Sequence, residues 1–169
     1  MIHSIIYREA DMEFTSEIFG QFDKKWALLT AGSKDDFNTM TISWGGLGTI
    51  WNKPVSTVYV RKSRYTHDYM EKNEYFTISF YSLQYKPILG VLGSKSGRDM
   101  DKIHDSKLTV KEAGESVSFE EAEVTIVCKK LFKQEISSSN MPKDIVEQFY
   151  SDNDLHDMYI GEVVDIIRK

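Results

Sequence analysis

The feature that most restricts the fold of this sequence is a series of short runs in which β-branched and apolar residues alternate with polar ones. This alternation has the period of a β-strand with one buried face. Strands are predicted over residues 25–31, 37–51 (interrupted by glycines), 55–62, 75–81, 118–136 (bent or split) and 158–167. The regular βαβ alternation of a doubly wound sheet is not present. We therefore expect a mainly β protein with short helices, a β-barrel with helical additions, forming one domain over residues 1–169.

The helical segments are few and short. They are predicted over residues 67–73, 88–92 and 99–104, and from Pro142 onward. Thr66 is a good N-cap for the first of them, and Gly93 is expected to end the second. The helix after Pro142 is amphipathic, with an apolar stripe formed by Ile145, Val146, Phe149 and Tyr150.

Composition argues against several classes of function. The formal net charge of -5 and the pI of about 5.4 disfavour a nucleic-acid-binding protein. The single cysteine, Cys128, excludes an internal disulfide, and its place in an alternating run predicts a small buried core residue. The four histidines show no ligand-pair spacing, so no metal site is predicted. Neither a signal peptide nor a run of roughly 18 apolar residues is present, and we expect a cytoplasmic protein without a membrane segment.

The segment VYVRKSRYTH, at residues 58–67, is the most informative for function. A predicted strand here delivers Arg61, Ser63, Arg64 and Thr66 to the start of a predicted helix. Guanidinium groups, hydroxyls and the N–H groups of a helix N-terminus are the donors that a phosphate group prefers. Because the chain as a whole is acidic, this local cluster of cations suggests a phosphate site. A solvated strand end followed by an ordinary N-cap is the alternative that spacing alone leaves open.

Two further segments carry glycines beside hydroxyl-bearing residues. Residues 38–48 contain Gly45, Gly46 and Gly48, which suit either the close approach of a flat ligand or a corner of a barrel. Residues 93–102 form a basic, hydroxyl-rich loop that matches neither a P-loop nor a nucleophile elbow. This loop is expected to be either a phosphate-contacting lid or a surface turn.

Taken together, these segments resemble the flavin reductase-like family, in particular its flavoredoxin and ferric reductase branch. The matching motifs are NTMTISWGG at 38–46, VRKSRYT at 60–66, SGRDMDK at 96–102 and HDMYIGEV at 156–163. They occur in the expected order, and the resemblance covers roughly residues 20–168.

The resemblance implies an FMN-binding split barrel of Greek-key type that forms a homodimer. It implies a flavin reductase-like oxidoreductase that passes electrons from NAD(P)H through bound FMN to flavin, iron or a partner protein. An FMN-binding electron-transfer protein without nicotinamide activity is the alternative.

The resemblance also assigns residues to three parts of the cofactor site. The ring and ribityl chain would lie along Asn38, Thr39, Met40, Thr41, Ser43 and Trp44. The phosphate would be held by Arg61, Ser63, Arg64 and Thr66. The residues that would close over the cofactor, from the same chain or from the partner subunit, are Ser96, Gly97, Arg98 and Lys102.

His156 is the one candidate catalytic residue. It is expected either to face the substrate side of the flavin or to be a structural residue at the start of the last strand. An imidazole suits both uses because its ordinary pKa lies near neutrality.

Overall fold

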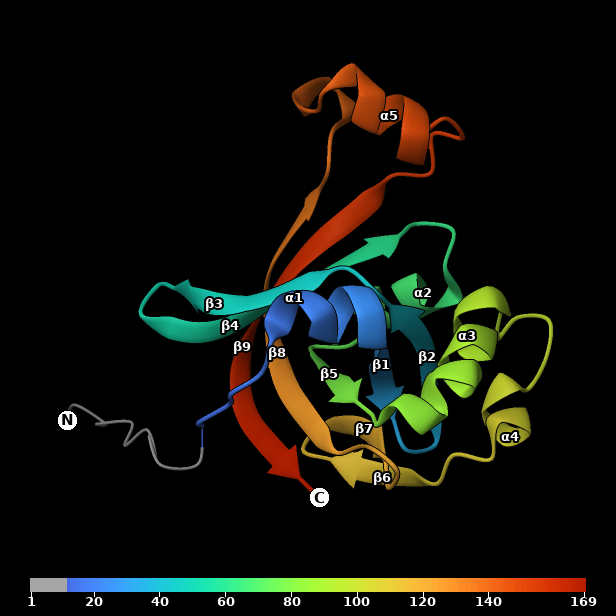
Figure 1. The fold of residues 1–169 in the computed structure, drawn as a ribbon. Coiled ribbons are helices and arrows are strands. Elements are labelled where there is room, and N and C mark those ends of the chain that lie inside the picture. Colours follow the sequence, from blue (N-terminus) through green and yellow to red (C-terminus); the bar gives the residue numbers. More distant parts are fainter. Residues whose placement is uncertain (1–11) are drawn as a thin grey trace.

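The computed structural model describes residues 12–169, and its main element is one antiparallel sheet of seven strands (Figure 1). The strand order is β2-β1-β5-β8-β9-β4-β3. The strands of this sheet are β1 (Ala27–Ser33), β2 (Asp36–Ile42), β3 (Gly45–Ile50), β4 (Lys53–Arg61), β5 (Tyr75–Phe80), β8 (Val124–Glu135) and β9 (His156–Arg168). A separate hairpin pairs β6 (Val110–Ala113) with β7 (Ser116–Phe119). The prediction of a mainly β fold with short helices is confirmed.

Two hydrophobic cores lie on opposite faces of this sheet. The first contains the inward side chains of β1, β2, β4, β5, β8 and β9, among them Met40, Phe76 and Tyr159. The second contains Leu28, on the other face of β1, together with residues of the β6–β7 region and of a helix that covers this face. Cys128 belongs to the first core and is fully buried, as the sequence predicted.

Short helices connect the strands, as expected. They are α1 (Ile18–Gly20), the π-helix η2 (Gln21–Lys25), α2 (Tyr65–Lys72), η3 (Leu83–Tyr85), α3 (Lys86–Ser94), α4 (Lys102–Ser106), η4 (Ser138–Asn140) and α5 (Lys143–Phe149). In Figure 1, α3 and α4 lie together on one side of the barrel, and α5 stands apart from the other helices at the end of an extension of β8 and β9. We call this extension, residues 136–155, the arm.

Several predictions about the helices are wrong. The helix predicted over residues 99–104 is α4, which begins at Lys102 because Asp101 is its N-cap and accepts from the N–H of His104. α2 begins two residues earlier than expected, so Arg64 is its N-cap and Thr66 is a buried residue of its first turn. α3 does not end at Gly93, because this residue lies within the last turn and packs against Thr41. In α5, Ile145 of the predicted apolar stripe is exposed, because the helix stands away from the barrel.

The chain enters the barrel through an unusual backbone segment. The π-helix η2 ends at Trp26, whose φ of 68° and ψ of 174° are strained values for a residue with a bulky side chain. This geometry explains why β1 begins at Ala27 and not at residue 25, where the sequence predicted it. It also turns the side chain of Phe22 into the first core, where its ring fits against Gly45 so closely that a Cβ there would lie 2.6 Å away.

Candidate functional site

The turn between β4 and α2 positions the cationic segment that the sequence singled out. β4 ends at Arg61, and the chain turns tightly, because the N–H of Arg64 donates to the carbonyl of Arg61 at 3.0 Å. α2 then starts at Tyr65, and the first N–H groups of a helix have no acceptor within the helix. The hydroxyl of Thr66 accepts a hydrogen bond of 2.7 Å from the Asn38 amide, which ties α2 to β2. The turn is therefore held between two elements of the sheet and the helix.

A first pocket, of about 130 Å³, opens beside this turn. We call it the cationic pocket, and it is lined by Asn38, Met40, Ser63, Arg64, Tyr65, Thr66, Lys95, Ser96 and Lys102. Ser96 and Lys102 thus meet Arg64 within one chain, and no partner subunit is needed to bring them together.

Two cations, the buried Lys102 and the half-buried Arg64, define the chemistry of the cationic pocket. The Lys102 ammonium donates to the carbonyls of Leu92 and Lys95, at 3.1 and 3.2 Å, and the Arg64 guanidinium donates to the carbonyl of Gly93. Burial, followed by the charge of Arg64, lowers the pKa of Lys102 to about 8. Burial likewise lowers the pKa of Arg64. Within residues 12–169 neither cation forms an ion pair with a carboxylate, so the pocket retains positive charge that an anion would neutralise.

The acceptors of these two cations are the last carbonyls of α3. The final carbonyls of a helix have no partner within it and carry partial negative charge. Leu92 and Gly93 supply two such carbonyls, and these explain why the Lys102 ammonium is tolerated although its side chain is buried. The carbonyls orient the two side chains, but they carry only partial charges and leave both positive charges uncompensated.

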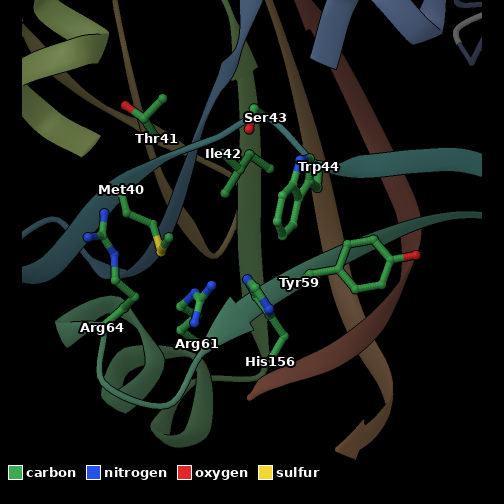
Figure 2. A pocket seen from close by; sticks show the side chains of 9 residues that line it. All are labelled: Met40, Thr41, Ile42, Ser43, Trp44, Tyr59, Arg61, Arg64 and His156. Atoms are coloured by element: carbon green, nitrogen blue, oxygen red, sulfur yellow. The ribbon is translucent and has the colours of Figure 1, made fainter. Parts of the chain in front are cut away.

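A second pocket, of about 220 Å³, adjoins the first (Figure 2). We call it the aromatic pocket, and it is lined by Met40, Thr41, Ile42, Ser43, Trp44, Tyr59, Arg61, Arg64 and His156. Met40 and Arg64 line both pockets, so the two pockets lie end to end. In Figure 2 the side chains of Trp44, Arg61 and His156 converge from the β2–β3 connection, β4 and β9, and Arg64 lies on the far side of Met40.

Arg61 lies in the aromatic pocket and not in the cationic pocket. Its guanidinium donates to the carbonyls of Phe149 and Asp154, both at 2.7 Å, and stacks on the ring of Tyr150 with 5.3 Å to the centroid. Asp154 also accepts from the N–H of Ser63 at 3.2 Å. Arg61 therefore holds the base of the arm. The sequence analysis had expected it to bind the phosphate and did not predict this structural role.

His156 lies between the arm and the aromatic pocket. Its ring contacts the Trp44 indole, with 5.3 Å between centroids, and its Nδ1 shares a hydrogen bond of 2.8 Å with the hydroxyl of Tyr150. Burial, followed by the charge of Arg61, lowers the pKa of His156 to about 4. The imidazole is therefore neutral at pH 7 and cannot serve there as a resident positive charge.

Three predicted site residues do not line either pocket. The Thr39 side chain points to the other face of β2, where it is buried and donates to the carbonyl of Leu29 at 3.1 Å. Gly97 packs beside the cationic pocket, and a Cβ there would lie 2.5 Å from the Asn38 side chain. Arg98 lies outside the pocket, where it pairs with Asp68 at 2.6 Å. Gly97 thus lets the loop approach β2, and Arg98 fastens the same loop to α2.

Four lining residues were not predicted, namely Ile42, Tyr59, Tyr65 and Lys95. Two of them could have been predicted from the alternation of side chains along their strands. Ile42 shares a face of β2 with Asn38 and Met40, and Tyr59 shares a face of β4 with Arg61, because alternate residues of a strand point to the same side.

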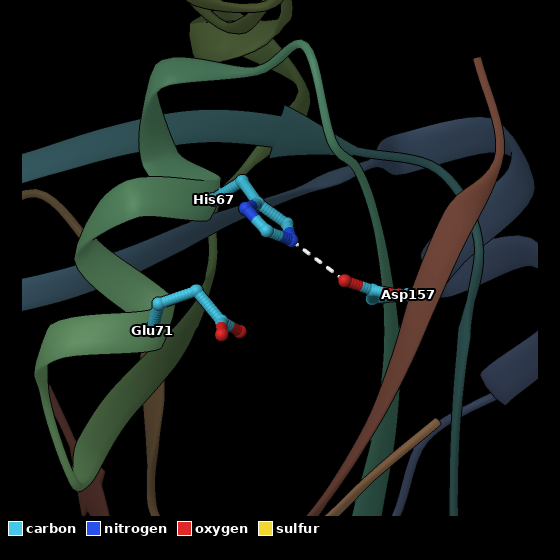
Figure 3. Close-up of side chains that lie close together, drawn as sticks. All are labelled: His67, Glu71 and Asp157. Atoms are coloured by element: carbon cyan, nitrogen blue, oxygen red, sulfur yellow. Dashed lines mark hydrogen bonds and ion pairs between the residues drawn. The ribbon is translucent and has the colours of Figure 1, made fainter. Parts of the chain in front are cut away.

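Outside these pockets, His67, Glu71 and Asp157 bring their side chains together, with ligand-type atoms within 4.8 Å of one another (Figure 3). His67 and Glu71 lie one turn apart on α2, a spacing that the sequence analysis did not recognise. His67 Nε2 lies 2.7 Å from Asp157, and the Lys133 ammonium lies 2.9 Å from Glu71 and 3.2 Å from Asp157. Both carboxylates are thus paired with a cation of the chain, and the cluster joins α2 to β8 and β9.

In chemical terms, one end of the cleft is cationic and hydroxyl-bearing, and the other end is lined by aromatic rings. This defines a class of β-barrel protein whose cleft suits a ligand with an anionic group at one end and a flat ring at the other. The flavin reductase like domain matches residues 19–169, and the chain belongs to this family.

Solved structures with the same fold are FMN-binding proteins and flavin reductase-like proteins. An FMN-binding protein from Thermus thermophilus, with bound 1-cyclohex-2-enone, is 22% identical with a TM-score of 0.65, over 85% of this chain and 69% of that chain. Flavoredoxin from Methanosarcina acetivorans is 20% identical with a TM-score of 0.68, over 86% and 68% of the two chains. Nitrilotriacetate monooxygenase component B from Bacillus cereus is 18% identical with a TM-score of 0.66, over 83% and 67%.

At these identities the likeness concerns the fold. No curated protein matches the chain. None of the helices in the described part of the chain is long and apolar enough to cross a membrane.

The cluster of Figure 3 leads to a prediction about acid stability. Burial opposes ionisation of Asp157, but hydrogen bonds from His67 and Lys133 outweigh it and hold the pKa of this carboxyl below its ordinary value of 3.8. Asp157→Asn should lower the free energy of unfolding at pH 7 by about 1.5–3 kcal/mol, because charge-assisted hydrogen bonds are lost.

A carboxyl whose pKa is lowered in the folded state stabilises the protein above its unfolded pKa and loses this effect as the pH falls through the folded value. The difference between the two proteins should therefore shrink below pH 3.8, as measured by urea unfolding over a range of pH. Asp165→Asn, at an exposed position of the same strand, is the matched control. Equal stability of Asp157→Asn and the control at pH 7 would contradict the prediction.

Proposed function

We propose that this chain binds FMN, with the phosphate in the cationic pocket and the isoalloxazine ring in the aromatic pocket. The observation that carries the proposal is the pair formed by the half-buried Arg64 and the buried Lys102, neither of which is ion-paired with a carboxylate within residues 12–169. A phosphate dianion supplies the missing charge and accepts from both side chains. Membership of the flavin reductase like family and the FMN-binding structural neighbours support the same ligand.

Residues of both pockets fit the two ends of this cofactor. For the phosphate we propose the charges of Arg64 and Lys102 and the hydroxyls of Ser63, Thr66 and Ser96. Asn38, Gly97 and Arg98 support this end, since they tie the loop 95–101 to β2 and α2.

For the ring and the ribityl chain we propose Met40, Thr41, Ser43 and Trp44, which line the aromatic pocket. Arg61 also lies at this end, where its guanidinium is paired with Asp152 at 3.4 Å and Asp154 at 3.9 Å, so its main role is to hold the arm beside the ring. His156 remains neutral and, through Tyr150, is fixed in orientation beside Trp44. We propose that it positions the ring or its partner and does not transfer a proton at pH 7.

Bound FMN would supply hydride and single-electron transfer, which no side chain of this protein provides. We propose that the protein is a flavin reductase-like oxidoreductase that takes electrons from NAD(P)H and delivers them to flavin, iron or a partner protein. We further propose that it acts in the cytoplasm as a homodimer. Support for a dimer comes from exposed apolar side chains on β8 and β9, at the end of β3 and in the turn that follows it, namely Ile50, Trp51, Leu131 and Val164.

The test of this function is the visible spectrum of the purified protein with FMN, before and after anaerobic addition of NADH or NADPH. Flavin bands that bleach with either nucleotide are the expected result. Bands that persist would remove the nicotinamide activity and leave an FMN-binding electron-transfer protein. A protein that takes up no FMN would refute the cofactor assignment.

Arg64→Ala should weaken FMN binding by about 10–150-fold, because a charge-assisted phosphate contact worth roughly 1.5–3 kcal/mol is lost. Riboflavin lacks the phosphate, so its affinity should change by less than about twofold. Isothermal titration with both ligands measures the difference. Lys129→Ala removes an exposed cation that pairs with Glu74, and it serves as the control. An equal loss of affinity for both ligands in Arg64→Ala would assign Arg64 to folding and not to the phosphate.

The buried Lys102 predicts a pH dependence for the same binding. Without ligand its pKa is about 8, and a bound phosphate raises it, so protons are taken up on binding at higher pH. The ratio of FMN to riboflavin affinity should be constant just below pH 8 and should fall by up to about tenfold per pH unit above it. Lys102→Met should give a lower ratio without this fall. A ratio that stays flat in the wild-type protein up to about pH 10 would contradict the role of Lys102.

A further inference from the structure

A cluster of side chains between α2 and β9 takes no part in the proposed FMN site. His67 and Glu71 lie four residues apart on α2 and therefore share one face of the helix, and Asp157 faces them from the start of β9. One ligand-type atom of each residue lies within 4.8 Å of the others. In Figure 3 all three side chains point into the space between the helix and the strand. We call this group the helix–strand cluster.

The donors of the helix–strand cluster are one imidazole and two carboxylates, a set that suits zinc and similar divalent ions. Zn²⁺ binds these groups at about 2.0–2.2 Å, so the ligand atoms of a tetrahedral site lie about 3.4 Å apart. His67 Nε2 and Asp157 are 2.7 Å apart, and all three ligand atoms fall within 4.8 Å, so the observed distances bracket this value. The cluster therefore has close to the spacing that three ligands of one ion need.

A cation of the chain already lies between the two carboxylates. The Lys133 ammonium is 2.9 Å from Glu71 and 3.2 Å from Asp157. The Asp157 side chain is only 1% exposed, and a carboxylate buried to this degree needs a positive partner. The Lys133 side chain, in contrast, is 38% exposed, so its ammonium can move into water while β8 stays in place. Lys133 thus marks a cation position that another cation can take by exchange.

The surroundings orient the ligands and leave one side of the cluster open. The hydroxyl of Tyr159 donates to the Glu71 carboxylate. Lys130, the other cation nearby, is directed to the carbonyls of Met70 and Glu71 at the end of α2. The Glu71 side chain is 40% exposed, so the cluster opens to solvent here. Outer contacts of this kind orient metal ligands, and an open side gives an ion an entry path and room for a water ligand.

We propose that His67, Glu71 and Asp157 form a binding site for a divalent cation of the zinc type, which takes the place of the Lys133 ammonium. In the metal-bound site the imidazole is neutral with its proton on Nδ1, and both carboxylates coordinate as anions. Lys133 stays protonated and turns to solvent, and water completes the coordination. The ion then joins α2 to β9. The three ligands line neither pocket, so this site does not require bound FMN.

The test is isothermal titration of the FMN-free protein with Zn²⁺, after chelator treatment and dialysis into phosphate-free buffer. We expect binding of one ion per chain. Lys133→Met should bind Zn²⁺ at least about tenfold more tightly, because no charge-assisted hydrogen bonds of the ammonium have to break. Glu71→Gln should bind it at least about tenfold more weakly, because a charged ligand is lost. Mg²⁺ prefers oxygen ligands and should bind the wild type at least about tenfold more weakly than Zn²⁺.

Two substitutions of the same chemistry outside the cluster serve as controls. Glu74→Gln removes a carboxylate that pairs with Lys129, and His104→Gln removes an exposed imidazole beside Asp105. Both should leave the affinity for Zn²⁺ within about twofold of the wild type. Urea unfolding establishes that each variant is folded, and Zn²⁺ should raise the midpoint of the wild type and of both controls.

Four results would overturn the proposal. If neither the folded wild type nor folded Lys133→Met binds Zn²⁺, the cluster is an ion-paired contact only. Equal affinities of Glu71→Gln and Glu74→Gln would place the ion elsewhere. Equal affinities of the wild type for Mg²⁺ and Zn²⁺ would indicate attraction to negative charge without coordination by the imidazole. Unchanged affinity in Lys133→Met would show that the ammonium and the ion do not share one position.

Discussion

Two positive charges in one pocket, one of them on the buried Lys102, are the constraint on which the candidate site depends. Arg64 comes from the turn before α2 and Lys102 from the start of α4, and each repels the other. The last carbonyls of α3 accept from both, so this helix end keeps the cations in place although it cannot neutralise them. The arrangement depends on the positions of α2, α3 and α4, which the packing of Met70 and Leu92 in the two cores fixes, because a shift of a helix would separate a cation from its carbonyl acceptor.

Much of the fold could be predicted from the sequence, because alternation reports directly on strands with one buried face. The runs around Val58, Ile78 and Tyr159 gave strands close to those of the structure. β6 gave no such signal, since its centre is Lys111-Glu112 and both side chains lie outside the cores. The π-helix and the strained Trp26 could not be predicted either, because they depend on how Phe22 packs in three dimensions.

The candidate site was predicted in outline, because its residues are close in the sequence at the β4–α2 turn and along β2. What the sequence could not give was the direction of each side chain. Arg61 and Arg64 are three residues apart and look equivalent as phosphate ligands, yet one holds the arm and the other lines the cationic pocket. Thr66 was expected to cap α2, but its hydroxyl accepts from Asn38, a residue 28 positions away. Long-range partners of this kind leave no local pattern.

Trp44 connects the arm to the cleft, although most of the arm stands away from the barrel. Its indole meets Phe149 at the end of α5 edge-on, at 5.4 Å between centroids, and also lines the aromatic pocket. Substitutions in the arm can therefore change the shape of this pocket without altering any residue that contacts a ligand. Since the arm contributes little to the two cores, it can diverge between related sequences faster than the barrel. Ligand preference within such a lineage could then shift while the strands and the cationic pocket stay the same.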